Sequence, residues 1–127
     1  MLEAAECIFC EISANRIVDQ NELCFVIRDG YPVTKLHSLI IPRRHTVDYF
    51  DLTNSEIISA NELLKSEKEK IQKIDPSVTG FNVGINSGKS SGQTIFHVHI
   101  HLIPRRDNDI KDPRGGVRGV IPNKKSY

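Results

Sequence analysis

The sequence predicts one domain that combines several short β-strands with a single long α-helix. Residues 96–104 alternate polar and apolar side chains, which is the period of a half-buried strand. Apolar runs at 23–27, 37–42 and 80–86 are bounded by glycine, proline or other turn-forming residues and predict further strands. Residues 53–75 carry apolar side chains at helical spacing and predict the helix. A chain of 127 residues is long enough to bury one core.

The predicted helix has a defined start. Thr53 and Glu56 fit a capping box, in which the Thr53 hydroxyl accepts from the Glu56 amide and the Glu56 carboxylate accepts from the Thr53 amide. Asp75 and Pro76 end the run. Residues 66–70 are mostly charged, and we expect this middle part of the helix to be mostly solvated. The apolar positions that repeat at helical spacing are Ile57, Ala60, Leu64, Ile71 and Ile74. We therefore assign this helix to packing rather than to chemistry.

Three histidines share one face of the predicted strand at 96–104. The alternation sends His97, His99 and His101 to one side, with neighbouring rings about 6.6 Å apart along the strand. A single histidine in such a position is more often structural, but packing does not require three. Because His97 and His101 stand roughly 13 Å apart along an extended strand, they do not readily bind one metal ion. An imidazole nucleophile with a helper on each side fits this geometry better.

A loop rich in glycine and serine, at 87–94, leads into the histidine strand. Its Gly88-Lys89-Ser90 triplet does not make a P-loop, because only three residues separate Gly84 from Gly88 and a strand follows where a helix is required. Small residues still bring backbone amides close to an anion. A donor-rich loop beside three imidazoles favours phosphorus as the electrophile. A histidine nucleophile must be neutral, so activity should fall as the pH drops below its pKa.

Cys7 and Cys10 form a C-x-x-C pair, which is the spacing of half a zinc site. A thioredoxin-like redox pair would need a strand before it, but only six residues precede Cys7. Burial of both cysteines as small apolar side chains is the remaining alternative. With Cys24 the chain has three cysteines, an odd number that favours metal ligation or free thiols over disulfides.

Other polar residues lie near the ends of predicted strands. Asp29 follows the strand at 23–27 in a turn, where it either hydrogen-bonds to nearby backbone or faces the hydroxyl groups of a ligand. His37 and His45 lie at the two ends of the strand at 37–42, and each taken alone is equally compatible with a structural role. Their function depends on whether the strand ends converge.

The charge of the chain is unevenly distributed. Residues 105–127 carry seven basic and three acidic side chains, whereas the rest of the chain is net negative within an overall charge of +1. A basic tail suits a phosphate-bearing ligand, although a solvated terminus is equally common, and we expect no nucleic-acid partner. No apolar run is long enough to span a bilayer, and residues 1–6 are short and acidic, unlike a signal peptide. We therefore expect a cytoplasmic protein that does not contact a membrane.

The histidine strand carries a family resemblance. Residues 97–103 resemble the His-φ-His-φ-His-φ-φ signature of the histidine triad (HIT) family of nucleotide hydrolases and transferases, where φ is apolar. Further matching segments follow in the family's order at 7–10, 27–29, 37–42 and 86–94. The resemblance implies an α+β fold with an antiparallel sheet of about five strands and one main helix. Residues 11–14, which follow the C-x-x-C pair, predict a short N-terminal helix. The resemblance also implies a homodimer and a single HIT domain over 1–127, with 105–127 as a basic tail.

The resemblance implies roles for individual residues. The middle histidine, His99, would attack the α-phosphorus of a nucleotide and form a nucleotidyl-histidine intermediate that water hydrolyses. His101 would bind and polarise the phosphate, and His37 would support the triad through hydrogen bonding. Gln93 belongs with this catalytic group. The matching substrate contacts are Asp29 at the ribose, Asn86 on the phosphate or nucleoside side, and Gln93 and Thr94 at the phosphate and leaving group.

A structural zinc ion follows from the same resemblance. The C-x-x-C pair is similar to that of the zinc-carrying bacterial members, in which the remaining ligands match His45 and His97. Zinc bound by Cys7, Cys10, His45 and His97 would pin the histidine strand to the N-terminal segment rather than activate water.

The resemblance leaves the substrate open. The phosphoramidase branch tends to end in a short tail that carries tryptophan, whereas this chain has no tryptophan and ends in a basic tail. That tail is similar to those of the dinucleoside polyphosphate hydrolases, so we expect cleavage at the α-phosphate of such a nucleotide. The alternatives are a purine nucleoside phosphoramidase and a non-catalytic, zinc-stabilised nucleotide-binding module. A hydrolase that uses the strand histidines as metal ligands is a further rival.

Overall fold

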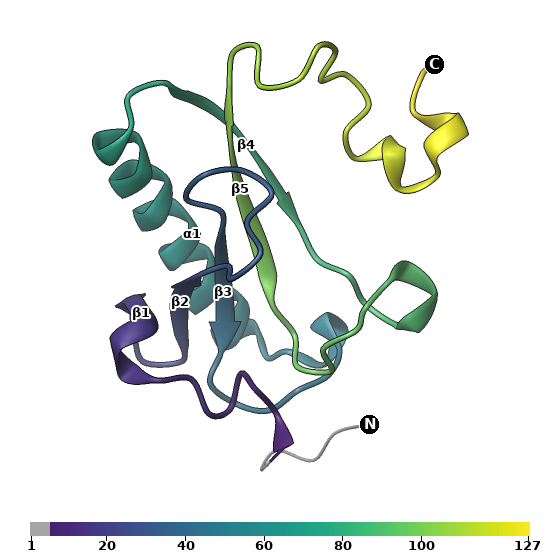
Figure 1. Cartoon of the computed structure of the whole chain (residues 1–127). Coiled ribbons are helices and arrows are strands. Elements are labelled where there is room, and N and C mark those ends of the chain that lie inside the picture. Colours follow the sequence, from purple (N-terminus) through teal and green to yellow (C-terminus); the bar gives the residue numbers. More distant parts are fainter. Residues whose placement is uncertain (1–5) are drawn as a thin grey trace.

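The computed structural model describes residues 6–127 and has two main layers, a sheet and a helix (Figure 1). The expectation for residues 1–6 falls almost entirely outside this range. The sheet contains β1 (Ile17–Gln20), β2 (Cys24–Arg28), β3 (Ser38–Pro42), β4 (Val78–Gly84) and β5 (Ile100–Arg106). These five strands pair antiparallel in the order β1-β2-β3-β5-β4. The helix α1 (Asn54–Ile74) packs on one face of the sheet, which confirms the predicted α+β fold.

The strands distribute their apolar side chains over both faces of the sheet. Along β2, Val26 packs in the cluster beneath α1, whereas its neighbours Phe25 and Ile27 belong to a second cluster. Successive side chains of a strand point to opposite faces, so this second cluster lies on the face away from the helix. Cys7 and Phe9 of the N-terminal segment complete it. The C-x-x-C segment therefore covers the sheet face that the helix leaves open.

The capping box predicted for α1 is present. The Thr53 hydroxyl accepts from the Glu56 amide at 3.1 Å, and the Glu56 carboxylate accepts from the Thr53 amide at 2.9 Å. Arg44 holds the same carboxylate at 2.8 Å, and these bonds keep the pKa of Glu56 below its usual range. The helix ends at Ile74, with Asp75 as its C-cap, where the sequence predicted its end.

Glu67 is the one buried side chain among residues 66–70, which are otherwise mostly solvated, as predicted. Its side chain is fully buried, and its Oε1 lies 2.6 Å from Nη1 of Arg28 on β2. The helical period explains the difference, because position 67 lies one turn from both Leu63 and Ile71 on the buried face. A buried carboxylate requires a partner, and Arg28 provides it from the sheet.

Two elements begin at other residues than predicted, and a third was not predicted. β5 begins at Ile100 rather than at residue 96, and the Val98 amide donates to the Thr46 carbonyl at 2.7 Å instead of to a sheet neighbour. The short N-terminal helix is a single 3-10 turn over Ala14–Arg16 rather than over 11–14. No sequence pattern had indicated β1, an edge strand of four residues that leaves every second side chain exposed.

The basic tail after β5 contains no α-helix, as predicted. It folds into two 3-10 turns, Arg118–Val120 and Pro122–Lys124. Figure 1 shows it in yellow, standing to one side of the sheet. Across residues 6–127, no helix is long and apolar enough to cross a membrane.

Candidate active site and metal centre

One pocket brings together the predicted catalytic and substrate-binding residues. It has a volume of about 420 Å³, and Phe9, Ile27 and Leu39 form its apolar wall. These three residues belong to the apolar cluster on the sheet face away from α1. The predicted site residues that line it are Asp29, His37, Asn86, Gln93, Thr94, His99 and His101. Residues from four separate segments of the chain therefore face one cavity.

His99 has the tautomer that a nucleophile needs. Its Nδ1 lies 2.8 Å from the backbone carbonyl of His97, and a carbonyl oxygen can only accept a hydrogen bond. Nδ1 must therefore carry the proton of the neutral ring, which leaves the lone pair on Nε2. The ring lines the pocket and is partly exposed.

His37 and His101 form a hydrogen-bonded relay beside this ring. The Val33 amide donates to Nδ1 of His37 at 3.0 Å, so His37 carries its proton on Nε2. That proton is donated to Nδ1 of His101, 2.9 Å away. Neutral His101 then carries its own proton on Nε2, where it can donate to an anionic ligand.

Burial keeps both rings of the relay neutral. Desolvation, together with repulsion from His99 and His37, lowers the pKa of His101 to about 4. Desolvation also lowers the pKa of His37, although the Asp29 carboxylate partly opposes this. Near neutral pH, Nε2 of His101 is therefore a neutral N–H donor.

Asp29 hydrogen-bonds within its own turn and also lies beside His37 of the relay. Its Oδ1 accepts from the Tyr31 amide at 2.8 Å, which is the backbone-turn role that the sequence left open. Its Oδ2 lies 3.5 Å from Nε2 of His37. The carboxylate lines the pocket, so this second oxygen can accept a hydrogen bond there.

Asp29, His37 and His101 also lie close enough together to hold a metal ion, with ligand atoms within 4.8 Å of one another. A metal would have to bind the lone pair of His37 Nε2. The Val33 amide occupies Nδ1, however, so Nε2 carries the proton and has no lone pair to offer. The contacts thus fit a relay better than a ligand set, which argues against a metal-dependent hydrolase at this position.

Gln93 lines the pocket, but its amide is engaged with the backbone. The side chain is 3% exposed; its Nε2 donates to the carbonyls of Val47 and Ile95, and its Oε1 accepts from the Gly88 amide at 2.9 Å. It therefore fastens the glycine-rich loop to the domain. Thr94, the next residue, is exposed at the pocket, and its hydroxyl makes no hydrogen bond with any described residue.

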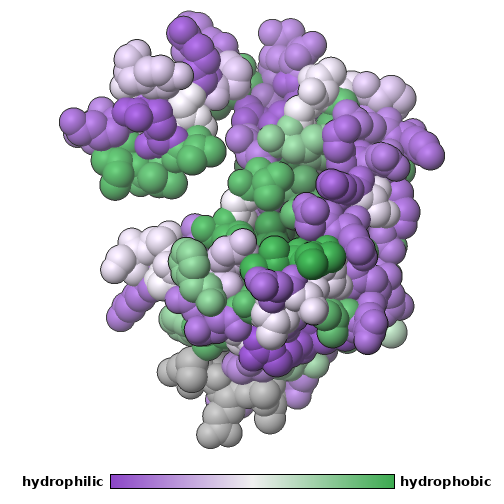
Figure 2. Space-filling model, turned by 180° about the vertical axis from the view of Figure 1, so that it is seen from behind, coloured by the Kyte–Doolittle hydropathy of each residue, from purple (hydrophilic) through white to green (hydrophobic). Residues whose placement is uncertain are grey.

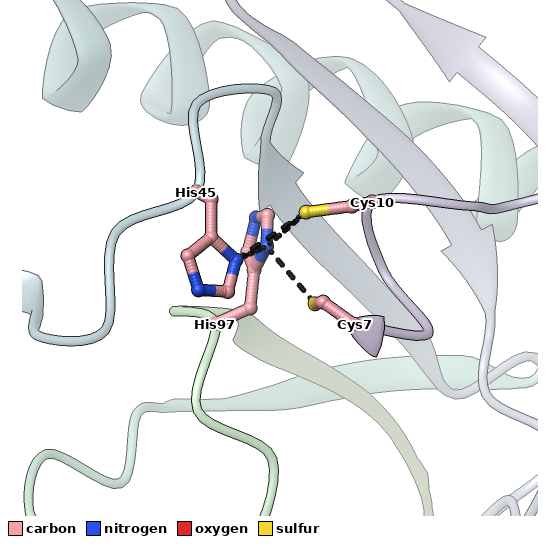
Figure 3. Close-up of side chains that lie close together, drawn as sticks. All are labelled: Cys7, Cys10, His45 and His97. Atoms are coloured by element: carbon pink, nitrogen blue, oxygen red, sulfur yellow. Dashed lines mark hydrogen bonds between the residues drawn. The ribbon is translucent and has the colours of Figure 1, made fainter. Parts of the chain in front are cut away.

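A second cluster contains the four predicted metal ligands. Figure 3 shows Cys7, Cys10, His45 and His97 converging on one point. The two Nδ1 atoms are 3.2 Å apart, Sγ of Cys10 lies 3.3 and 3.5 Å from them, and Sγ of Cys7 lies 3.4 Å from His97. A zinc tetrahedron with bonds of about 2.3 Å to sulfur and 2.0 Å to nitrogen has edges of about 3.3 to 3.8 Å. The observed separations match those edges.

The protonation of this cluster also suits zinc. Nε2 of His97 donates to the Pro42 carbonyl at 2.7 Å, so Nδ1 keeps its lone pair and points at the cysteines. Desolvation and the neighbouring Cys7 raise the pKa of the Cys10 thiol to about 11. A cation between the two sulfur atoms would stabilise their thiolate forms. Two sulfur and two nitrogen donors form a set that structural zinc sites use.

A model of the HIT domain matches residues 11–108, from just after the C-x-x-C pair to just after β5. The chain belongs to the HIT family. A similar structure is that of a zinc-bound histidine triad family protein from Mycobacterium smegmatis, with a TM-score of 0.77 and 30% identity. That alignment covers 87% of this chain and 82% of the other.

Other HIT relatives have names that specify a reaction. The structure of diadenosine triphosphate hydrolase from Plasmodium falciparum aligns with a TM-score of 0.73 and 31% identity, over 80% of this chain and 68% of that one. Adenylylsulfatase HINT3 from Arabidopsis thaliana is 33% identical, over 82% of this chain and 54% of its own length. The HIT family thus includes hydrolases that act on different nucleotides.

Two contributors to this HIT site escaped sequence analysis. The Val33 amide sets the tautomer of His37, and no side-chain pattern reveals a backbone donor. Phe9 packs edge-on against His99, with ring centroids 5.0 Å apart. No sequence signal distinguished Phe9 from Ile8, which also lies between the two cysteines but is 57% exposed.

Proposed function

We propose that this HIT domain hydrolyses a dinucleoside polyphosphate at its α-phosphorus through a nucleotidyl-histidine intermediate on His99. The observation that carries the proposal is the hydrogen bond from Nδ1 of His99 to the His97 carbonyl. That bond leaves the lone pair on Nε2 of a ring that lines the pocket. An imidazole with a free lone pair on its exposed side is a competent nucleophile.

In the first step, Nε2 of His99 attacks the α-phosphorus. A P–N bond forms, the P–O bond to the bridging oxygen breaks, and the remaining nucleoside phosphate leaves with the electron pair. The ring becomes cationic, and the His97 carbonyl stabilises it because it already accepts the Nδ1 proton. Nε2–H of His101 donates to a non-bridging oxygen, with His37 behind it at 2.9 Å.

In the second step, water attacks the same phosphorus. A P–O bond forms, the P–N bond breaks, and His99 recovers its electron pair while the water releases a proton to solvent. A nucleoside monophosphate leaves the pocket. Asp29 is proposed to hold the ribose, and the exposed Asn86 and Thr94 to contact the phosphate and leaving group. Gln93 is proposed to act through the loop that it fastens.

The choice of substrate rests on two supports. Relatives named diadenosine triphosphate hydrolase and adenylylsulfatase favour a substrate that carries an adenylyl group. The basic tail at 105–127 favours a long polyphosphate over a phosphoramidate.

Turnover of the two substrate classes tests this proposal. Wild type and His99→Ala are incubated with a diadenosine polyphosphate and with an adenosine phosphoramidate, and the release of AMP is measured. We expect hydrolysis of the first by wild type alone. Faster turnover of the phosphoramidate would favour the phosphoramidase reaction. No turnover of either above the His99→Ala rate would mean that the domain only binds nucleotides.

We further propose that Cys7, Cys10, His45 and His97 hold a structural zinc ion. When bound, zinc would cross-link the N-terminal turn to the segment before β5, and it would take no part in the reaction. A site built from thiolates needs reduced cysteines, which supports the expectation of a cytoplasmic location. The fit of the four donor distances to a zinc tetrahedron supports this assignment.

We also propose that residues 1–127 form one domain and that a second copy covers the face shown in Figure 2. That view shows apolar side chains in the middle of the body and on the tail, with a hollow between them. A groove of about 300 Å³ between α1 and β4 is lined mainly by Ile57, Ile58, Leu64, Val83 and Ile85. The exposed aliphatic side chains of the tail are Ile110, Val117, Val120 and Ile121.

Charge supports a second copy as the occupant of this face. The tail is basic while the rest of the chain is net negative, so the tail of one copy complements the body of another. Light scattering after size exclusion should give the mass of a dimer. Val83→Glu, at a side chain that is 52% exposed on an edge strand, should give a monomer. A wild type that elutes as a monomer would refute the proposed homodimer.

A further inference from the structure

Phe9 lies between the two cysteines of the metal cluster and points into the protein. The Cys10 amide donates to the Cys7 carbonyl at 3.1 Å, which closes the segment into a tight turn. Within that turn Ile8 is 57% exposed, whereas Phe9 is only 5% exposed. The turn therefore presents one aromatic ring to the interior.

The ring of Phe9 touches both sites of the molecule. Its centroid lies 5.0 Å from that of His99, with the ring planes at 67°, and 6.0 Å from that of His97, at 88°. Both are edge-to-face contacts, the arrangement that aromatic pairs prefer. One side chain thus contacts a proposed metal ligand and the proposed nucleophile.

Few contacts fix the orientation of the His99 ring. The bond from Nδ1 to the His97 carbonyl fixes its tautomer, but a single hydrogen bond still allows the ring to tilt about it. Two neighbouring rings, those of Phe9 and His101, limit that tilt. The ring centroids of His99 and His101 are 5.2 Å apart. His101 is itself fixed by His37, so Phe9 is the neighbour whose position is least constrained by the sheet.

The turn that carries Phe9 has few other attachments. Among the described residues, its segment pairs with no strand, and its one backbone hydrogen bond is the local bond from Cys10 to Cys7. The turn is held by the burial of Phe9 and Cys7 in the apolar cluster and by the two sulfur atoms beside His45 and His97. Loss of a metal that joins those four side chains would loosen the turn.

We propose that Phe9 positions the imidazole of His99 for attack and that the metal-bound turn keeps Phe9 in place. Metal occupancy then controls the rate of nucleophilic attack although the metal takes no part in the chemistry. This inference rests on the proposed role of His99 as the nucleophile.

Phe9→Leu tests the proposal, with Phe25→Leu as the matched control. Both residues are 5% exposed in the same apolar cluster, but only Phe9 contacts His99. We expect Phe9→Leu to lower kcat about tenfold with little change in KM, because a misplaced reacting group slows chemistry more than binding. Phe25→Leu should lose similar thermal stability and retain kcat. A raised KM with unchanged kcat would show that Phe9 is only a wall of the pocket.

A second measurement does not depend on activity. Nitrogen chemical shifts of the His99 ring are recorded for wild type and Phe9→Leu, each with zinc and after removal of zinc by a chelator. We expect zinc removal to shift the wild-type signals toward those of Phe9→Leu and to leave the variant almost unchanged. Wild-type signals that do not respond to zinc removal would overturn the inference. If they respond in a protein that hydrolyses no nucleotide, the proposed function fails and the positioning contact stands.

Discussion

Lowering the pH should destabilise the protein through His101, by an amount that the structure sets. Burial lowers the pKa of this ring from 6.5 to about 4. Each pKa unit is worth about 1.4 kcal/mol, so the neutral ring adds about 3 kcal/mol to the free energy of unfolding above pH 6.5, relative to pH below 4. The sign follows from proton uptake. Between these two values the unfolded chain binds the proton and the folded protein does not, so stability rises with pH across the window.

His101→Gln isolates this contribution. Its side-chain oxygen can still accept from Nε2 of His37, but the group does not titrate. Urea unfolding of both proteins is measured at about pH 7 and about pH 4.5, and acid-induced loss of metal affects both alike. We expect the wild type to lose about 2 to 3 kcal/mol more than His101→Gln between these values. Equal losses would mean that His101 is not held neutral, and the relay derived from its contacts would be wrong.

Three further predictions follow from other contacts. Arg28→Ala leaves the buried Glu67 carboxylate without its partner and should cost about 3 to 5 kcal/mol in urea unfolding, whereas Lys70→Ala, at an exposed pair with Asp19, should cost about 1 kcal/mol or less. Gln93→Leu frees the glycine-rich loop and leaves its buried backbone partners unpaired. It should lower kcat/KM about tenfold and also lower the melting temperature, which steady-state kinetics and thermal melting measure. Zinc analysis should find one ion per chain, and His45→Ala should lose it together with several degrees of melting temperature.

Local signals predicted the elements that depend on local chemistry. The capping box at Thr53 and the helix end at Asp75 require only neighbouring residues, and both lie where the sequence placed them. The burial of Glu67 could not be predicted from neighbouring residues, because it depends on the ion pair with Arg28 on β2. The alternation correctly predicted which side chains share a face. The strand starts only at Ile100, however, because the Val98 amide donates to the Thr46 carbonyl, which lies outside the sheet.

The residues of the site could be predicted, but their proton positions and hydrogen-bond partners could not. The resemblance named the residues that line the pocket, and the structure brings them together in one cavity. It could not assign the proton positions, because these depend on the backbone groups of Val33, Pro42 and His97. Nor could it show that the side-chain amide of Gln93 is already engaged with the backbone, since its partners come from three separate positions in the chain.

Capture of the covalent intermediate tests the central claim most directly. Wild-type protein in excess is mixed with a diadenosine polyphosphate, quenched in base within milliseconds, digested and analysed by mass spectrometry. We predict one adenylyl group on the peptide that contains His99, and none in His99→Ala. An adenylyl group on another residue, or AMP released in a single turnover with no covalent species at any time, would contradict the proposed chemistry.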